Sequence, residues 1–291
     1  MSQLDEMDYI EGRLAETPLR KTGWTTIDPM TEHDANVRRR PYVVLAVWTA
    51  LALVPMVVLT RVMTAPVTPG CFEYCNLSQQ LAAFGFRFVG LLWLLGVLVV
   101  AWDWRDREPS IAAASAVAAA IPLTVVVPGL LYVGQGTLFT EDQILLAWVV
   151  NLGLQLPPVW RLSRRATPSI PLRIVVGIMD LAVVAAALSI LLFGTSFVWS
   201  AGPYGVLIAW VTSQIGVLLV AIAAWRNRIL PPYVVGPLVV ASLPVLLVPV
   251  GIVAPGNIAY VIFLAFPLTA IAWIWLAVAW LRGIGIEPSR P

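Results

Sequence analysis

Eight long apolar segments place the strongest constraint on how this chain of 291 residues can fold. A helix needs roughly 20 apolar residues to cross the hydrocarbon core of a bilayer, and the segments are close to that length, the fourth only just. We therefore predict an all-α, polytopic membrane bundle of about eight transmembrane helices with a tail at each end. The predicted spans are 42–63, 81–102, 111–133, 144–160, 173–194, 203–225, 233–254 and 258–281.

The composition is typical of a helical membrane protein and argues against a transmembrane β-barrel and a nucleic-acid-binding protein. Hydrophobic residues make up 59% of the chain and charged residues 12%, whereas charged residues form about 25% of an ordinary soluble domain. Long apolar runs such as 91–101 do not show the alternation of a transmembrane β-strand. The net charge of +2 and the scattered basic residues exclude a nucleic-acid partner, so the expected surroundings are a lipid bilayer.

The arginines predict the orientation of the spans. Arg38, Arg39 and Arg40 precede the first span, and basic residues collect on the cytoplasmic side of membrane proteins. With eight spans, nearly all loop arginines then fall on that side, whereas Arg61 alone lies at an outer span end. The inner set is Arg105, Arg107, Arg161, Arg164, Arg165, Arg173, Arg226, Arg228, Arg282 and Arg290. We expect a cytoplasmic-membrane protein with both termini in the cytoplasm.

The two tails lie outside the predicted membrane domain of residues 41–282. Residues 1–40 are rich in charge and poor in aromatic residues, which predicts disorder or docking onto a partner. Within them, Leu4, Met7, Ile10 and Leu14 follow helical spacing, so a short amphipathic helix is the alternative. Residues 283–291 form the cytoplasmic C-terminal tail.

The second half of the sequence shows signs of repeating the first. The motif from Gly96 to Arg107 recurs from Gly216 to Arg228, and Pro122 and Pro128 are matched by Pro244 and Pro249 at offsets of 121 to 122. Four spans per unit would give two halves of the same orientation, a parallel 4+4 tandem repeat. The competing explanation is chance, because Val, Leu, Trp and Arg are common at any span end. A repeat predicts that 42–160 and 173–281 superpose.

The residues needed for enzymatic chemistry are scarce. His33 is the single histidine, between Glu32 and Asp34 in the tail, which excludes histidine-based metal or haem sites in the spans. Asp103, Asp106 and Glu108 alternate with arginines, a pattern of a self-neutralised loop rather than a cation site. We find no catalytic motif and predict no metal, no cofactor and no catalytic residue.

Cys71 and Cys75 are the two cysteines, and both lie in the longest predicted outer loop. An exported loop is in an oxidising environment, which favours a disulfide between them. The alternative is a redox-active pair, but the two residues are four apart and lack the Cys-x-x-Cys spacing.

Polar residues inside the spans are the candidates for a functional pocket. A charge at the bilayer centre costs at least about 2.5–3.5 kcal/mol, so Arg87 and Asp180 each need a partner, water or, for the long arginine, an outward reach. Asp180 should lie at a depth similar to that of Gln155, which shares a helix face with Asn151. Ser213 and Gln214 fall in the middle of the sixth span. Together with Asp180 they predict one polar pocket, and the alternative is that the amides and hydroxyls only join helices.

Prolines interrupt the seventh span at Pro237, Pro244 and Pro249. Each one frees a backbone carbonyl that must find another donor, which predicts a kinked or broken helix with a hinge at Pro244 and Pro249.

These observations favour a small-solute or lipid permease, or a channel-like subunit, with the polar pocket as its binding site. The alternative is a non-catalytic accessory or assembly subunit of a larger membrane complex that recruits other subunits through residues 1–40. An enzyme acting on lipid or isoprenoid is a third hypothesis, without a convincing catalytic site.

Overall fold

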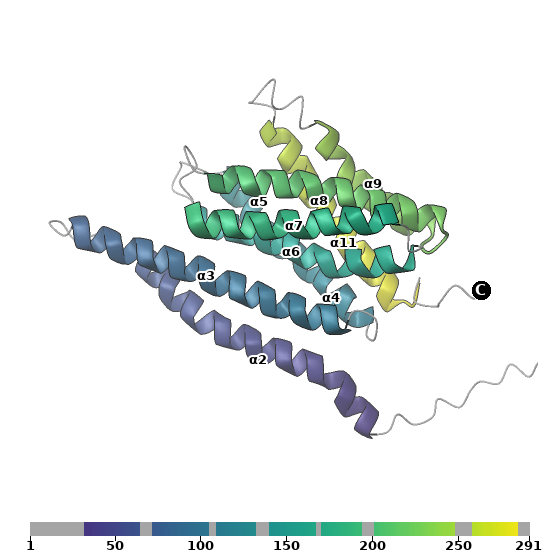
Figure 1. The fold of residues 1–291 in the computed structure, drawn as a ribbon, viewed down its shortest axis with the longest axis horizontal. Helices are drawn as coiled ribbons and strands as arrows, with labels where there is room; N and C mark the ends of the chain where they lie inside the picture. Colours follow the sequence, from purple (N-terminus) through teal and green to yellow (C-terminus); the bar gives the residue numbers. More distant parts are fainter. Residues whose placement is uncertain are drawn as a thin grey trace, which may run out of the picture. The chain divides into compact units, whose positions relative to one another are not determined.

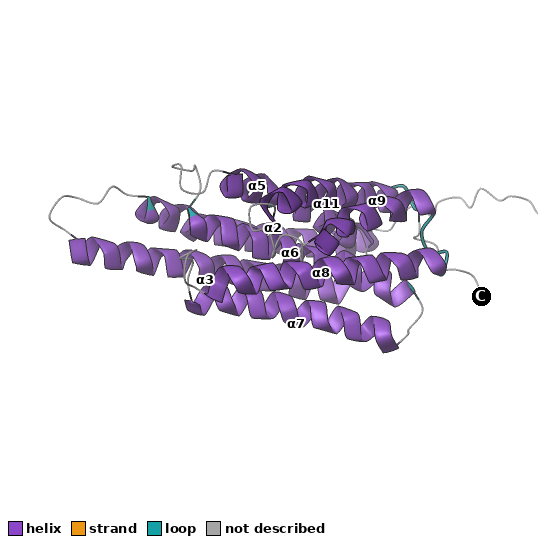
Figure 2. Ribbon diagram, turned by 90° about the horizontal axis from the view of Figure 1, so that it is seen from above, coloured by secondary structure: helices purple, strands orange, loops and turns teal. Residues whose placement is uncertain are grey.

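The computed structural model describes residues 32–64, 72–104, 109–131, 140–166, 170–193, 201–247 and 258–284 (Figure 1). The chain divides into two units, 1–40 and 41–291, and the fold below concerns the second. All regular secondary structure in the described residues is helical, which confirms the all-α prediction (Figure 2). The elements are α2 (Glu32–Met63), α3 (Phe72–Trp104), α4 (Pro109–Ala120), α5 (Leu123–Leu131), α6 (Glu141–Arg165), α7 (Ile170–Phe193), α8 (Ala201–Arg226), α9 (Pro232–Ser242), the 3₁₀ helix η1 (Leu243–Leu247) and α11 (Ile258–Leu281).

Within the described residues, six helices are long and apolar enough to cross a membrane. They are Arg40–Met63, Leu77–Trp104, Ser110–Pro128, Glu141–Arg165, Ile170–Leu192 and Tyr204–Arg226. The predicted seventh and eighth spans correspond to shorter apolar helices, Pro232–Leu247 and Ala265–Leu281. A count of eight spans therefore stays a prediction. Two bounds also differ from expectation, because α3 begins at Phe72, inside the predicted outer loop, and α6 is longer than 144–160.

Helix α6 is the central element of the bundle. It contacts α3, α4, α5, α7 and α8, and 89% of the residues in its most apolar stretch are buried. It is also the least apolar of the six long helices. Thr140 and Gln143 form a capping box at its start, and its acidic first turn and basic last turn both complement the helix dipole. The sequence thus places its most polar span where protein, not lipid, surrounds it.

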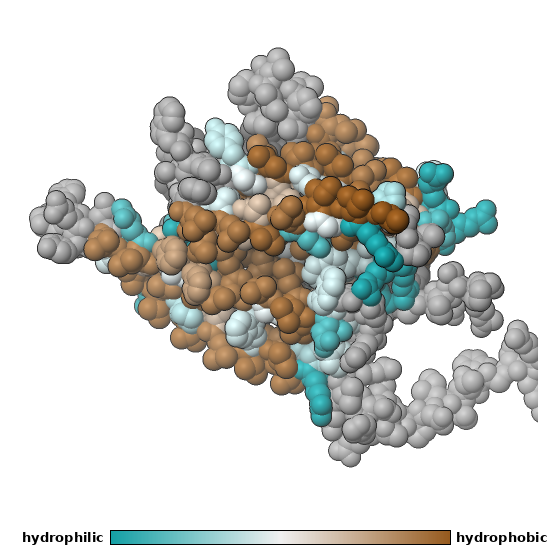
Figure 3. All heavy atoms as spheres, viewed as in Figure 1, coloured by the Kyte–Doolittle hydropathy of each residue, from teal (hydrophilic) through white to brown (hydrophobic). Residues whose placement is uncertain are grey.

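The peripheral helices carry the apolar surface. Only 6% of the corresponding stretch of α2 is buried, against 28% in α3 and in α7. Large exposed side chains on these helices include Leu51, Val54, Leu181 and Leu192. Figure 3 shows apolar residues along the helix flanks of one face, with the hydrophilic ones gathered mainly toward one end. This distribution is what a bundle surrounded by hydrocarbon requires.

Helices α3 and α6 run parallel, and their contacts follow one register. Arg87 pairs with Asp142 at one end, and Trp102 packs on Trp160 at the other. Between them, Gly90 lies against the Leu146 side chain, and Leu94 lies against Gly153. A Cβ at Gly90 would fall 2.4 Å from a Leu146 methyl carbon, so any other residue here would force the Leu146 side chain to move. Small residues that allow close approach are typical of helix pairs in membranes.

At two prolines inside helices, a side chain from a neighbouring helix satisfies the carbonyl that the proline leaves without a donor. Pro158 inside α6 cannot donate to the Leu154 carbonyl, and the Ser115 hydroxyl donates to it at 2.8 Å. Pro237 in α9 likewise frees the Tyr233 carbonyl, which accepts the Trp275 indole N–H at 3.0 Å. At these two prolines a side-chain donor from a neighbouring helix therefore replaces the lost backbone hydrogen bond.

Replacing Ser115 by alanine tests this arrangement. The change leaves the buried Leu154 carbonyl without a donor, which we expect to lower the free energy of unfolding by about 1–3 kcal/mol. Ser242→Ala is the control, because that buried hydroxyl donates to Leu238 of its own helix, a carbonyl that keeps its helical partner. Thermal unfolding of the purified protein measures both, and equal effects of the two variants would contradict the expectation.

The third and seventh predicted spans both break at their matched prolines. Helix α4 ends at Ala120 before a turn at Ile121–Pro122, and α9 ends at Ser242 before η1, which contains Pro244. The two ends are 122 residues apart (242 − 120), the offset of the sequence match. Superposition of the two halves stays a prediction, as does the hinge, since Pro249 lies outside the described residues.

Candidate functional site

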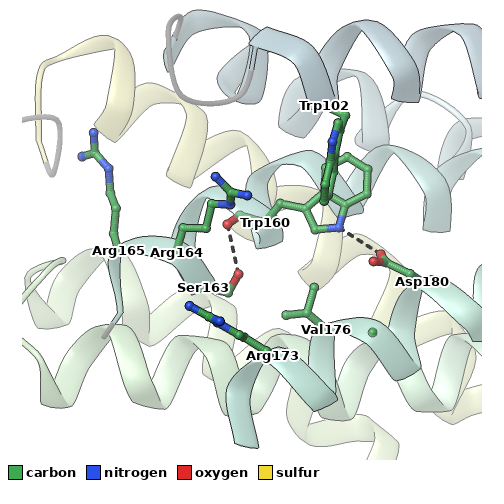
Figure 4. Close-up of a pocket in the computed structure, with 9 residues that line it drawn as sticks. Trp102, Trp160, Ser163, Arg164, Arg165, Arg173, Val176 and Asp180 are labelled. Atoms are coloured by element: carbon green, nitrogen blue, oxygen red, sulfur yellow. Dashed lines mark hydrogen bonds between the residues drawn. The ribbon is translucent and has the colours of Figure 1, made fainter. Parts of the chain in front are cut away.

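A cleft of about 720 Å³ opens between α3, α6 and α7 at the arginine-bearing ends of α6 and α7 (Figure 4). Helix α3 contributes Trp102, and α6 contributes the turn from Trp160 to Arg165. The remaining lining comes from the start of α7. A Cβ at Gly177 of this helix would meet no atom within 4 Å. The lining residues are Trp102, Trp160, Ser163, Arg164, Arg165, Arg173, Val176, Gly177 and Asp180.

Two tryptophans form the wall of the cleft. The Trp102 and Trp160 rings meet edge to face with centroids 4.9 Å apart, and the Trp160 indole N–H donates to Asp180 Oδ1 at 2.9 Å. The Arg164 guanidinium lies over the Trp102 ring, 5.9 Å from its centroid, a cation–π contact. Each aromatic ring therefore holds a charged group of the lining in place, as Figure 4 shows for Asp180.

The charges of the lining favour an anion. Three guanidinium groups and one carboxylate leave a net charge of +2 (3 − 1). Arg164 and Arg165 lie in the last turn of α6, where cations interact favourably with the helix dipole. The planar N–H fork of arginine matches carboxylate and phosphate oxygens. Figure 4 shows Asp180 next to the Trp160 indole, away from Arg164 and Arg165.

The predicted polar residues occupy two different places. Asp180 is half-buried and lines the cleft, where its Oδ1 accepts the Trp160 indole N–H. Asn151, Gln155, Ser213 and Gln214 are instead fully buried and do not line the cleft. Gln155 Nε2 donates to Asn151 Oδ1 at 2.8 Å. Asn151 Nδ2 donates to the Ala119 carbonyl at the end of α4, so this amide joins two helices.

Several other polar atoms of the core have no hydrogen-bond partner within the part of the chain that the structure describes. They are Gln155 Oε1, Ser213 Oγ, Gln214 Nε2, Trp148 Nε1 and Trp210 Nε1, in side chains from α6 and α8. Each unsatisfied buried group costs about 1–3 kcal/mol, so five of them would cost an amount comparable to the whole stability of a typical domain. The amides and hydroxyls could be chosen from the sequence by their position in the spans, whereas nothing in the sequence marked Trp148 and Trp210 as different from other core tryptophans.

Arg87 does not reach outward as its long side chain would allow. It is 8% exposed, and its Nε lies 3.3 Å from Asp142 Oδ1, while an Nη donates to the Ile190 carbonyl at 2.6 Å. The guanidinium thus joins the first turn of α6 to the last turns of α7. Sequence reasoning missed Asp142, although the Thr140–Gln143 capping pattern could have placed it in the first turn of a helix.

Some predicted features lie outside the described residues. These are Cys71, the side chains of His33 and Cys75, and residues 1–31, so the disulfide and the tail helix stay predictions. In the part of the chain that the structure describes, no three His, Cys, Asp or Glu side chains are grouped so that they could hold a metal ion. Comparison with known families, curated proteins and solved structures finds no match to this chain.

Proposed function

We propose that this chain is a multi-pass, permease-like membrane protein whose substrate carries an anionic group, and that the cleft between α3, α6 and α7 recognises that group. The observation that carries the proposal is the row of Arg164, Arg165 and Arg173 beside two tryptophans at the end of the most polar helix. Basic pockets between membrane helices on the cytoplasmic side suit phosphate head groups. The arginine rule supports that side, with both termini in the cytoplasm.

The anionic group could belong to a phospholipid of the inner leaflet or to a soluble anion such as inorganic phosphate. Both present oxygens that arginine binds through paired N–H groups. The Trp102 and Trp160 rings suit a lipid, because aromatic side chains favour the headgroup region. The volume of about 720 Å³ admits either one. The two sources therefore become separate arms of one experiment.

The test uses the full chain, purified in mild detergent and reconstituted into vesicles of phosphatidylcholine. One arm measures the binding and transbilayer movement of fluorescent phosphatidylglycerol, and the other measures the uptake of inorganic phosphate. We expect activity in one arm, and Arg173→Gln should lower it about tenfold, because a charge-assisted hydrogen bond is lost from the site.

The matched control is Arg282→Gln, which removes the same charge from an exposed position outside the cleft. It should leave activity unchanged. Asp180→Asn keeps an oxygen that can accept the Trp160 N–H while removing the carboxylate charge, so it should tighten anion binding. Activity in neither arm, or equal losses in Arg173→Gln and Arg282→Gln, would exclude the cleft as the binding site.

The accessory-subunit hypothesis has one observation of its own. Asn151 and Ser115 are both bonded to backbone carbonyls of neighbouring helices, so these polar groups join helices and do not line a path. An assembly subunit needs such a rigid core and a surface for other helices, and α2 offers a largely exposed one. A stoichiometric partner in a mild-detergent pull-down, lost on deleting residues 1–31, would favour this function over transport.

A further inference from the structure

We propose that α6, α8 and α11 hold an internal site for a small inorganic anion, bound by the indole N–H groups of Trp148 and Trp210 together with Ser213 and Gln214. This site is separate from the cleft, since none of the four residues lines it. The proposal does not depend on the anion that the cleft recognises.

The two tryptophans come from different helices and converge on one phenyl ring. Trp148 of α6 and Trp210 of α8 both pack edge to face on Phe266 of α11, with ring centroids 5.4 Å and 5.9 Å apart. Ser213 and Gln214 lie three and four residues after Trp210, one helical turn further along the same face of α8. All four polar residues are at most 4% exposed, so no outer solvent reaches them.

The indole N–H groups at this position differ from those of four other tryptophans in the described chain. Trp48, Trp93, Trp160 and Trp275 each donate their indole N–H to an oxygen of the protein. Among the described residues, Trp148 Nε1 and Trp210 Nε1 have no acceptor, and neither Gln214 Nε2 nor Ser213 Oγ has a partner. Asn151 Oδ1 already receives the Gln155 amide, and Gln155 Oε1, an unpartnered acceptor of this core, is not bonded to any of the four side chains.

The chemistry of the set selects an acceptor guest without a positive charge. Trp148, Trp210 and Gln214 present N–H donors, and the Ser213 hydroxyl can turn to donate as well. No carboxylate belongs to the set, and the two indoles can only donate, so the set holds more donors than acceptors. Neutral donors bind an anion less tightly than a buried arginine would, and weaker binding suits a site that must also release the anion.

Iodide is the probe, because it quenches the fluorescence of an indole that it touches. We would titrate the full chain in detergent with sodium iodide, replacing sodium gluconate at constant ionic strength. Exposed tryptophans should give quenching that rises without saturation, and the internal site should add a saturable component. Trp210→Phe should reduce that component, and Gln214→Leu and Ser213→Ala should raise its half-saturation about tenfold, as expected for the loss of a hydrogen bond to an ion.

Three controls separate this site from other effects. Trp275→Phe removes an indole N–H that already has an acceptor, and Ser242→Ala removes a buried hydroxyl bonded within its own helix, so both should keep the saturable component. Arg173→Gln, which changes the cleft, should also keep the saturable component. The internal site can therefore be tested whether or not the cleft binds an anion. If Gln214→Leu does not fold, Ser213→Ala decides. No saturable quenching in the wild type, or unchanged saturation in Ser213→Ala and Gln214→Leu, overturns the proposal and leaves water as the guest.

Discussion

Replacing Arg87 by leucine is expected to lower the free energy of unfolding by about 3–5 kcal/mol, the largest effect of any single change considered in this chain. The substitution leaves Asp142 charged in a poorly solvated place, 3.3 Å from where the guanidinium Nε had been. It also removes the donor that reaches the Ile190 carbonyl near the end of α7. Thermal or denaturant unfolding in one detergent, compared with the wild type, measures the loss.

A double substitution separates the pair from the rest of the environment. In Arg87→Leu with Asp142→Leu both charges are gone, so we expect recovery of a large part of the lost stability, since a buried ion pair can be replaced by apolar side chains at little net cost. Arg61→Leu is the matched control, because Arg61 is exposed at the end of α2. If the double variant is no more stable than Arg87→Leu, the ion pair is not the source of the effect.

Replacing Gly90 by leucine is expected to cost about 1–3 kcal/mol through overpacking of α3 against α6. Two Leu146 methyl carbons lie 2.4 Å and 3.0 Å from the position of the new Cβ, and the rest of the leucine side chain has to displace them. Because Arg87 and Asp142 lie on the same seam, a shift of α3 would also strain their contact. The melting temperature of the purified variant measures the cost.

The matching control is Gly236→Leu, at a helical glycine where a Cβ would meet no atom within 4 Å. It should be close to neutral. In a second variant, Gly90→Leu with Leu146→Ala, the smaller residue at 146 makes room for the new leucine. This variant should be more stable than Gly90→Leu alone. Equal destabilisation at Gly90 and Gly236 would show that helix packing at the α3–α6 contact is not what requires glycine.

The sequence predicted the kinds of element well because the length of an apolar run decides whether it can cross a membrane as a helix. It also placed Asn151 and Gln155 on one helix face, where their side chains are bonded to each other. It placed Asp180 at a depth similar to that of Gln155 but could not show its hydrogen-bond partner, because spacing along one helix says nothing about which side of a neighbouring helix it faces. That partner is Trp160.

The breaks in the third and seventh predicted spans also show that a sequence can reveal where a helix ends but not which residues of other helices contact it. Pro122 and Pro244 could be marked as points of interruption from the sequence, and the helices do end beside them. The sequence near Pro158 or Pro237 does not predict which side chains donate to the carbonyls that these prolines leave free. Ser115 and Trp275 are 43 and 38 residues away from those prolines (158 − 115 and 275 − 237), so only the packed structure reveals the pairs.

The burial of α6 bears on how such a chain is inserted during synthesis. A helix that contains Asn151, Gln155 and two prolines partitions poorly into lipid by itself, and its cost falls only when neighbours cover it. Helices α3, α4 and α5 leave the ribosome first and already offer α6 a protein surface, whereas α7 and α8 follow and close over the remaining side. We therefore expect α6 to be inserted against these three earlier helices, each of which contacts it, and truncation after Arg165 should leave it retained in the membrane by them.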